Sequence, residues 1–216
     1  MAVRDALLAL LTAGPAYGFQ LHGGLAARTG GRRSINVGQT YATLERLSKQ
    51  GLVEPAGATD DGLPLHRLTK AGRGAAQAWL EGMDAAGSDP WDETVDRVLI
   101  ARSLPGQDAD SVVAAERGRW EARRVEASAA GQVRDLDEDD GESELARLAA
   151  AAESARADAA LAWLDAVGHA ERQPFAPRSE RPKRGRRPGG AAAVATAEPA
   201  DADDAPGDTA QASARA

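Results

Sequence analysis

Four polar side chains recur at helical spacing within residues 35–54, INVGQTYATLERLSKQGLVE. At about 100° per residue they share one stripe, apart from a second, mainly apolar side. The stripe consists of Gln39, Thr43, Arg46 and Gln50, and the other side of Val37, Thr40, Tyr41, Leu44, Leu47 and Ser48. Amide, hydroxyl and guanidinium groups in such a row can meet base edges and phosphates in a DNA major groove. Taken alone, the row favours an ordinary solvated helix face, so the flanking elements must decide.

Two helices are predicted before this segment. The first covers about residues 3–13, and Pro15 opens the second, which stops near Gly30. Ser34 or Asn36 is a suitable N-cap for the third helix, the one that carries the polar row. The three helices would then follow one another through short connections.

A hairpin and a fourth helix are predicted after the segment. Gly51 stands where a left-handed residue commonly ends a helix, residues 55–63 have the composition of a hairpin tip, and residues 65–68 form the returning strand. Thr69 is a suitable N-cap for a helix that runs to about Met83. Three helices, a hairpin and a helix in this order predict a winged helix-turn-helix, in which the third helix reads DNA.

Three short motifs make this prediction more specific, because GPAYGFQL, GQTYATLERLSKQGLVE and HRLTKAGR resemble the PadR family of transcriptional regulators. The matching positions are Tyr17, Gly18, Phe19, Thr40, Tyr41, Leu44, Leu47, Leu68, Thr69 and Gly72. The resemblance covers about residues 5–80. It implies a DNA-binding regulator, most often a repressor, that binds a palindromic operator as a homodimer. It also implies a small aromatic or hydrophobic effector near the dimer interface.

The residues expected to bind double-stranded DNA divide by role. Groove contacts are expected from the first turns of the third helix, and phosphate contacts from the cations around it. The groove candidates are Ser34, Gln39, Thr40 and Thr43, and the phosphate candidates are Arg32, Arg33, Arg46, Lys49 and Arg67. Tyr41 fits a core position and a phosphate contact equally well. Because the hairpin tip carries Asp60 and Asp61, we expect weak wing contact and most of the binding from the third helix.

The second half of the chain has helical patterns with sparse apolar stripes. Residues 91–104, 110–135 and 144–170 each indicate a helix, and stripes this thin favour pairing in a dimerisation region. Four tryptophans are candidates for an effector lining, although core anchoring is the favoured interpretation. They are Trp79, Trp91, Trp120 and Trp163. The predicted fold class is mainly α with a small β-hairpin wing, an N-terminal winged helix-turn-helix joined to a C-terminal helical dimerisation region.

Charge divides the chain as the patterns do. Residues 1–80 hold nine Lys or Arg against five Asp or Glu, and residues 81–173 hold ten Arg against 22 acids, so the net charge of -7 conceals a basic first module. We expect a DNA-binding domain at 1–86, a helical dimerisation domain at 87–173 and a disordered low-complexity tail at 174–216. The basic stretch near the start of that tail fits a solubilising segment better than a phosphate-binding arm.

Catalytic and metal-binding patterns are missing from the sequence. The three histidines, His22, His66 and His169, are far apart, cysteine is absent, and no phosphate-binding glycine motif occurs. We therefore expect neither an enzyme nor a cofactor or metal. With no apolar run of 18 residues and no signal-peptide pattern, a cytoplasmic protein without membrane contact is expected. The alternative is a winged-helix protein-interaction module that does not read DNA, and an enzyme of unrecognised type is a distant third.

Overall fold

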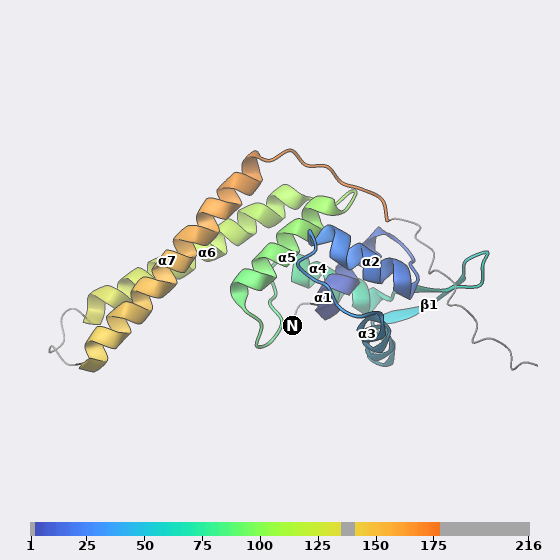
Figure 1. The fold of residues 1–216 in the computed structure, drawn as a ribbon, viewed down its shortest axis with the longest axis horizontal. Helices are drawn as coiled ribbons and strands as arrows, with labels where there is room; N and C mark the ends of the chain where they lie inside the picture. The colour runs from blue at the N-terminus through green and yellow to red at the C-terminus, as the bar shows by residue number, and fades with distance from the viewer. Residues whose placement is uncertain (1–2, 135–140, 178–216) are drawn as a thin grey trace, which may run out of the picture. The chain divides into compact units, whose positions relative to one another are not determined.

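The computed structural model describes residues 3–134 and 141–177, the side chains of 131–134 and 141 excepted, and the described residues fall in one compact unit. Its helices and strands are shown in Figure 1. In chain order they are α1 (Val3–Leu10), the 3-10 turn η1 (Leu11–Ala13), α2 (Gly18–Arg28), α3 (Val37–Lys49), β1 (Val53–Ala58), β2 (Pro64–Leu68), α4 (Lys70–Leu80), α5 (Pro90–Ser103), α6 (Ala109–Arg134) and α7 (Gly141–His169). The predicted basic stretch within residues 178–187 lies outside the described residues.

The first four helices and the hairpin form the predicted winged helix-turn-helix. Their shared core is leucine-rich, and its fully buried members include Leu7, Leu25, Leu44 and Leu47. Thr69 caps α4 as predicted, since its hydroxyl accepts the Gly72 N–H at 3.0 Å. The prediction of a mainly helical chain with a β-hairpin wing is therefore confirmed.

The segment before α2 is extended, so the prediction that Pro15 opens this helix is wrong. The Ala16 N–H donates to the His66 carbonyl at 3.0 Å, and the His66 N–H donates to the Ala16 carbonyl at 2.9 Å. These two bonds hold residue 16 in an isolated antiparallel bridge beside β2, and α2 begins only at Gly18. Sequence periodicity missed this because the pairing partner lies fifty residues farther along the chain.

The wing is a two-stranded antiparallel hairpin. Val53 pairs with Leu68 and Glu54 with Arg67, and the ladder becomes irregular between Pro55 and Ala58. Val53 and Leu68, the pair at the base of the hairpin, are buried, whereas the tip is exposed. The core residues therefore fix the base of the wing against the helices and leave its tip in solvent.

The C-terminal half consists of α5 followed by the long helices α6 and α7, which run antiparallel side by side (Figure 1). Pro90 in the first turn and the Asp89 carboxylate, which accepts the Trp91 and Asp92 N–H groups, start α5. This helix contacts α1, α2 and α4 on one side and α6 on the other. Helix α5 is thus the element that joins the winged helix to the helical pair.

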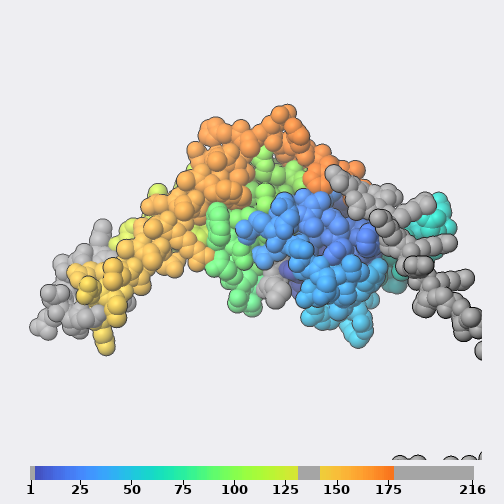
Figure 2. All heavy atoms as spheres, viewed as in Figure 1, coloured from blue at the N-terminus to red at the C-terminus, as the bar shows by residue number. Residues whose placement is uncertain are grey.

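After α7 the chain crosses back to α2, as the orange segment of Figures 1 and 2 shows. The Phe175 N–H donates to the Ser103 carbonyl at 3.1 Å, and Arg172 donates to the carbonyls of Leu104 and Gln107. Residues 170–177 are called the strap below. The structure describes residues 174–177 of the predicted tail, where Phe175 packs against Arg28, and the rest of that tail, 178–216, lies outside the described residues.

Candidate nucleic-acid interface

Helix α3 begins with a capping box. The Asn36 side chain accepts the Gln39 N–H at 2.8 Å, and the Gln39 side chain accepts the Asn36 N–H at 3.2 Å. Of the two N-caps allowed by the sequence, Asn36 is the one used. Ser34 lies two residues earlier and is exposed, so its expected place in the first turn of the helix is wrong. The box satisfies two backbone donors and uses the side-chain oxygen of Gln39, whose NH₂ group takes no part in it.

Two residues of the predicted groove set are buried. Thr40 has no exposed surface, and its hydroxyl lies 3.5 Å from Nδ1 of His22. Thr43 is 6% exposed and accepts a hydrogen bond from Arg46 at 3.1 Å. Thr40 therefore belongs to the contact between α2 and α3 rather than to a DNA surface. Thr43 positions the Arg46 guanidinium through this hydrogen bond.

The outward face of α3 differs from the predicted stripe. Leu44 and Leu47 point into the core, so the opposite side of the helix presents Gly38, Ala42, Glu45 and Lys49 to solvent. Gln39, Arg46 and Gln50 are exposed but lie on the flank between this face and the core. The first half of this face has short side chains, at Gly38 and Ala42, and the second half carries the Glu45–Lys49 ion pair. The short side chains let that half of the helix approach the floor of a groove closely.

Tyr41 lies on the other flank and is 46% exposed. Its ring covers Gly18 so closely that a Cβ built there would stand 2.5 Å from the Tyr41 Cε1 atom. This contact explains why glycine follows Tyr17 at the start of α2, and sequence reasoning did not foresee it. The ring is therefore a packing group that also has exposed surface, and a phosphate contact by its hydroxyl stays a prediction.

Arg32 and Arg33, expected to bind phosphates, are bound to carboxylates of α5. Arg32 Nη2 lies 2.8 Å from an oxygen of Asp92, and Arg33 Nε lies 2.5 Å from Oδ2 of Asp96. The Asp96 side chain is fully buried, and burial raises its pKa although the Arg33 hydrogen bond opposes this. Burial alone would lower the pKa of Arg33, but the hydrogen bond and charge of Asp96 raise it. Arg33 is thus engaged within the protein.

The remaining cations of the set are in exposed pairs. Lys49 bonds Glu45 at 2.6 Å one turn away on α3, and Arg67 bonds Glu54 at 2.8 Å across the wing. The Lys49 hydrogen bond lowers the pKa of Glu45. Exposed ion pairs contribute little stability, so Lys49 and Arg67 can exchange these partners for phosphates at small cost. Within the described part of the chain, Arg46 donates to its own helix alone, to the Ala42 carbonyl and to Thr43.

The four tryptophans are structural in different ways. Trp79 and Trp120 are buried, and their ring N–H groups donate to Glu93 at 2.6 Å and to Thr94 at 2.9 Å. Trp91 meets Trp120 and Trp163 edge to face, with ring centroids 6.1 and 5.2 Å apart. These contacts agree with the favoured interpretation as core anchors, and an effector lining stays a prediction.

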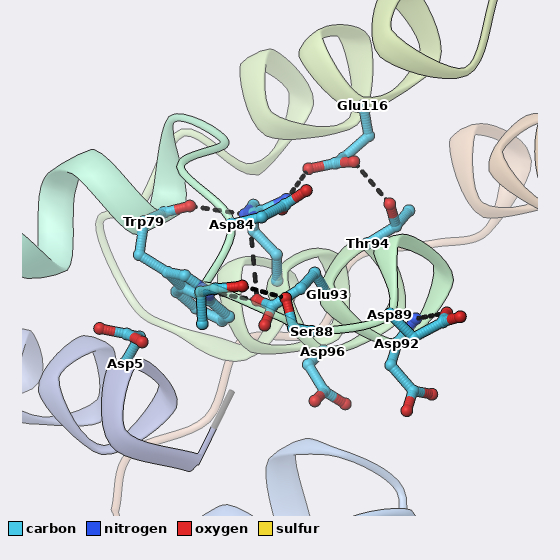
Figure 3. A network of polar contacts seen from close by, with 12 residues as sticks. Asp5, Trp79, Asp84, Ser88, Asp89, Asp92, Glu93, Thr94, Asp96 and Glu116 are labelled. Atoms are coloured by element: carbon cyan, nitrogen blue, oxygen red, sulfur yellow. Dashed lines mark hydrogen bonds and ion pairs between the residues drawn. The ribbon is translucent and has the colours of Figure 1, made fainter. Parts of the chain in front are cut away.

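A buried polar network links α4, α5 and α6 (Figure 3). The Arg97 guanidinium forms ion pairs with Glu116 and, at 2.7 Å, with Asp84, and it donates to the Trp79 carbonyl. Burial alone would raise the pKa of Glu116, but the Arg119 hydrogen bond and the Arg97 charge keep it below its usual value. The network satisfies most of its polar atoms and therefore joins the three helices in one arrangement.

Within 3–134 and 141–177, no group of three or more His, Cys, Asp or Glu side chains is arranged to hold a metal ion. Along those stretches, no helix combines the length and the apolar character that crossing a bilayer requires.

Comparison with known proteins gives a family for the first module. Residues 7–78 match the profile described as "Transcriptional regulator PadR-like family". No curated protein matches the chain. Similar solved structures include Bacillus subtilis PadR in complex with operator DNA, with 17% identity, 77% of this chain and 96% of that chain covered, and a TM-score of 0.36. PadR of the same organism in complex with p-coumaric acid is 18% identical, with 77% of this chain and 96% of that chain covered and a TM-score of 0.34. A transcriptional regulator from Clostridium thermocellum is 22% identical, with 36% of this chain and 75% of that chain covered and a TM-score of 0.34.

Proposed function

Residues 7–78 are a PadR-like transcriptional-regulator domain, and from this premise we propose that the chain reads an operator in double-stranded DNA with α3. The observation that supports this most directly is the outward face of α3. It is capped at Asn36, backed by buried leucines, and small at Gly38 and Ala42. A helix with this relief fits a major groove, with polar side chains on its flanks reaching bases and phosphates.

In this proposal the DNA contacts come from a reduced set of side chains. Lys49 stands on the outward face, Gln39 and Arg46 lie on one flank of it, and Tyr41 lies on the other flank. Arg67 adds one phosphate contact from the wing, whose tip carries acids. Arg32 and Arg33 act indirectly, by tying the segment before α3 to α5.

We further propose that the protein works as a homodimer on a palindromic operator. Support comes from α6 and α7, which expose Val125, Leu145 and Leu148 with 64%, 69% and 60% of their surfaces in solvent. Large apolar side chains on a long helical pair are suited to burial against a second copy. One α3 per half-site would place the half-sites about 34 Å apart or a multiple of that distance.

The remaining parts of the proposal follow from the family. They are repression rather than activation, response to a small apolar or aromatic molecule, a cytoplasmic location, and no catalytic activity. We propose residues 1–86 as the DNA-binding domain, 87–173 as the dimerisation domain and the residues after them as a tail. A winged-helix module for protein contacts is the second candidate, favoured by the exposed ion pairs that already occupy Lys49 and Arg67.

The decisive experiment is fluorescence anisotropy with DNA from beside the protein's own gene, at several salt concentrations. Ala42 is exposed at the centre of the outward face, so Ala42→Glu places a charge where the groove floor would lie. We expect it to weaken binding at least tenfold while the melting temperature stays unchanged. Ala114→Glu makes the same change at an exposed position on α6 and should bind DNA as the parent does.

Other outcomes separate the candidates. If the parent binds this DNA no better than a random duplex, the regulator proposal fails and the protein-interaction module becomes the better account. Specific binding that Ala42→Glu leaves intact would show that another surface reads DNA. Analytical ultracentrifugation at the same concentrations tests the dimer independently.

A further inference from the structure

A cleft of about 420 Å³ lies beside the predicted polar stripe, between the start of α1 and one flank of α3. This volume is within the range of small-molecule pockets. Its apolar lining comes from Val3, Ile35 and Leu47, and its polar lining includes Gln39, Arg46 and Gln50. The polar stripe that could read DNA therefore also forms one wall of this cleft.

The polar side of the cleft is rich in donors. Arg46 gives two of its five N–H groups to acceptors on its own helix, and no carboxylate among the described residues pairs with it. The Gln39 side-chain oxygen is used by the capping box, which leaves its NH₂ group for another acceptor. Arg4 adds a second guanidinium, bound to Asp5 through one nitrogen at 2.7 Å. Such an edge fits an anionic acceptor group.

The apolar side of the cleft has a different preference. Val3, Ile35 and Leu47 are all aliphatic, and none of the described residues that line the cleft is aromatic. Leu47 is 1% exposed and belongs to the core, so this wall is held in place by the packing of the domain. An aliphatic body in contact with these groups would remove apolar surface from water on both sides.

We propose that this cleft binds a small molecule with a compact aliphatic body and one carboxylate, and that the bound molecule competes with DNA. The carboxylate meets Arg46 and the Gln39 amide, and the aliphatic body rests on Ile35 and Leu47. Because Arg46 and Gln39 are then engaged, α3 loses its flank contacts to the operator. The binding step stands on the cleft alone, and the competition rests on the proposed function.

The first test is binding without DNA, by isothermal titration of the full chain with cyclohexylacetate. Cyclohexylethanol lacks the charge and inorganic phosphate lacks the body, so both should bind at least tenfold more weakly. Arg46→Gln should weaken cyclohexylacetate about tenfold, and Ile35→Trp, which fills the cleft, should abolish its binding. Arg117→Gln removes an exposed guanidinium from α6, outside the cleft, and should change nothing.

Circular dichroism confirms that each variant is folded, and Arg46→Gln keeps the test valid if Ile35→Trp disturbs the segment before α3. Equal binding of phosphate and cyclohexylacetate, or binding that survives both variants, would overturn the proposal. In anisotropy, cyclohexylacetate should raise the apparent Kd for operator DNA in the parent and have no effect in Ile35→Trp. If the carboxylate binds but no DNA does, the site stands while the proposed function fails. If DNA binds and the carboxylate does not, the reverse holds.

Discussion

The Arg28 guanidinium lies over the ring of Phe175, 4.4 Å from its centroid, although 147 residues separate the two. Arg28 also donates to the Ser103 carbonyl at 2.6 Å and to the Phe175 carbonyl at 2.8 Å. It has no carboxylate partner among the described residues, and burial lowers its pKa. The ring therefore shields a cation that only carbonyl groups and a π face compensate.

Removing that ring should destabilise the protein. Phe175→Ala is expected to lower the free energy of unfolding by about 1 to 2 kcal/mol, because it removes the cation–π contact and part of the strap's apolar burial. Urea denaturation measures the change. Met83→Ala shortens a side chain that is 68% exposed and should stay within about 0.5 kcal/mol of the parent. Equal effects of the two variants would mean that the strap contributes no stability.

Two glycines of α4 should respond to alanine with opposite signs. A Cβ at Gly72 would collide with the Leu52 carbonyl, a backbone group that cannot turn aside, so Gly72→Ala should cost about 1 to 3 kcal/mol. Gly74 has no atom within 4 Å of its Cβ position, and Gly74→Ala should stabilise by about 0.5 to 1 kcal/mol. Urea melts of both variants check this, and a destabilising Gly74→Ala would contradict the helix geometry.

The buried Arg97 should be among the most sensitive positions. Arg97→Leu leaves Glu93 in the core without its cation and Glu116 with Arg119 alone, and breaking such a buried pair costs about 3 to 5 kcal/mol. Thermal and urea unfolding would show the loss. Arg123→Leu, at a half-exposed arginine 3.9 Å from Asp84, should change the stability by less than about 1 kcal/mol. A mild Arg97→Leu would mean that the network relaxes when its centre is removed.

Stability should depend on pH through Asp5. Burial raises the pKa of this carboxyl, and the nearby Glu93 adds to the effect while Arg4 opposes it. A raised folded-state pKa means that the contribution is fully present below the unfolded value of about 3.9 and is lost as pH rises through the folded value. Asp5→Asn should therefore be more stable than the parent at pH 7, and the gain should vanish below about pH 4.

A carboxylate with the opposite shift provides the control for Asp5. Hydrogen bonds from Ser111 lower the pKa of Asp108, so its contribution is present at neutral pH and lost on acidification. Asp108→Ala should be less stable than the parent at pH 7 and approach it below about pH 4. Unfolding free energies at both pH values decide, and the same sign for both variants would contradict the assignment.

Under the proposed function, two arginines should differ in the salt dependence of DNA binding. Arg46 is free to meet a phosphate, so Arg46→Gln should reduce the slope of log affinity against log salt by about 0.9. Arg32 is held by Asp92, and Arg32→Gln should leave the slope nearly unchanged. Anisotropy titrations at four salt concentrations measure both slopes. A matching loss in Arg32→Gln would show that the pair with Asp92 opens on DNA.

Local signals predicted the elements of the first module well. The Thr69 cap of α4 and the leucine spacing of α3 act within one or two helical turns, so a short stretch of sequence is enough to predict them. The choice between Ser34 and Asn36 as N-cap stayed open because either residue can supply the oxygen. Gly51 has a φ of 68°, as the predicted left-handed stop requires.

The candidate surface was harder to predict, because it depends on what packs against α3. A helical wheel cannot tell that Thr40 meets His22 on α2. The partners of Arg32 and Arg33 lie about sixty residues away on α5, and no residue near the arginines in the sequence indicates these pairs. Sequence position therefore indicated which residues surround the reading helix, while tertiary contacts decide which of them are available.

The pairing of Ala16 with His66 has a consequence for self-association. Because β1 covers one edge of β2 and residue 16 covers part of the other, β1 carries the longer open edge of this small sheet among the described residues. Pro55 in β1 offers no N–H, and the irregularity before Ala58 interrupts the register there. A strand from another molecule would meet few aligned backbone N–H and carbonyl groups along β1. The wing can therefore project into solvent without offering an edge for strand-to-strand association.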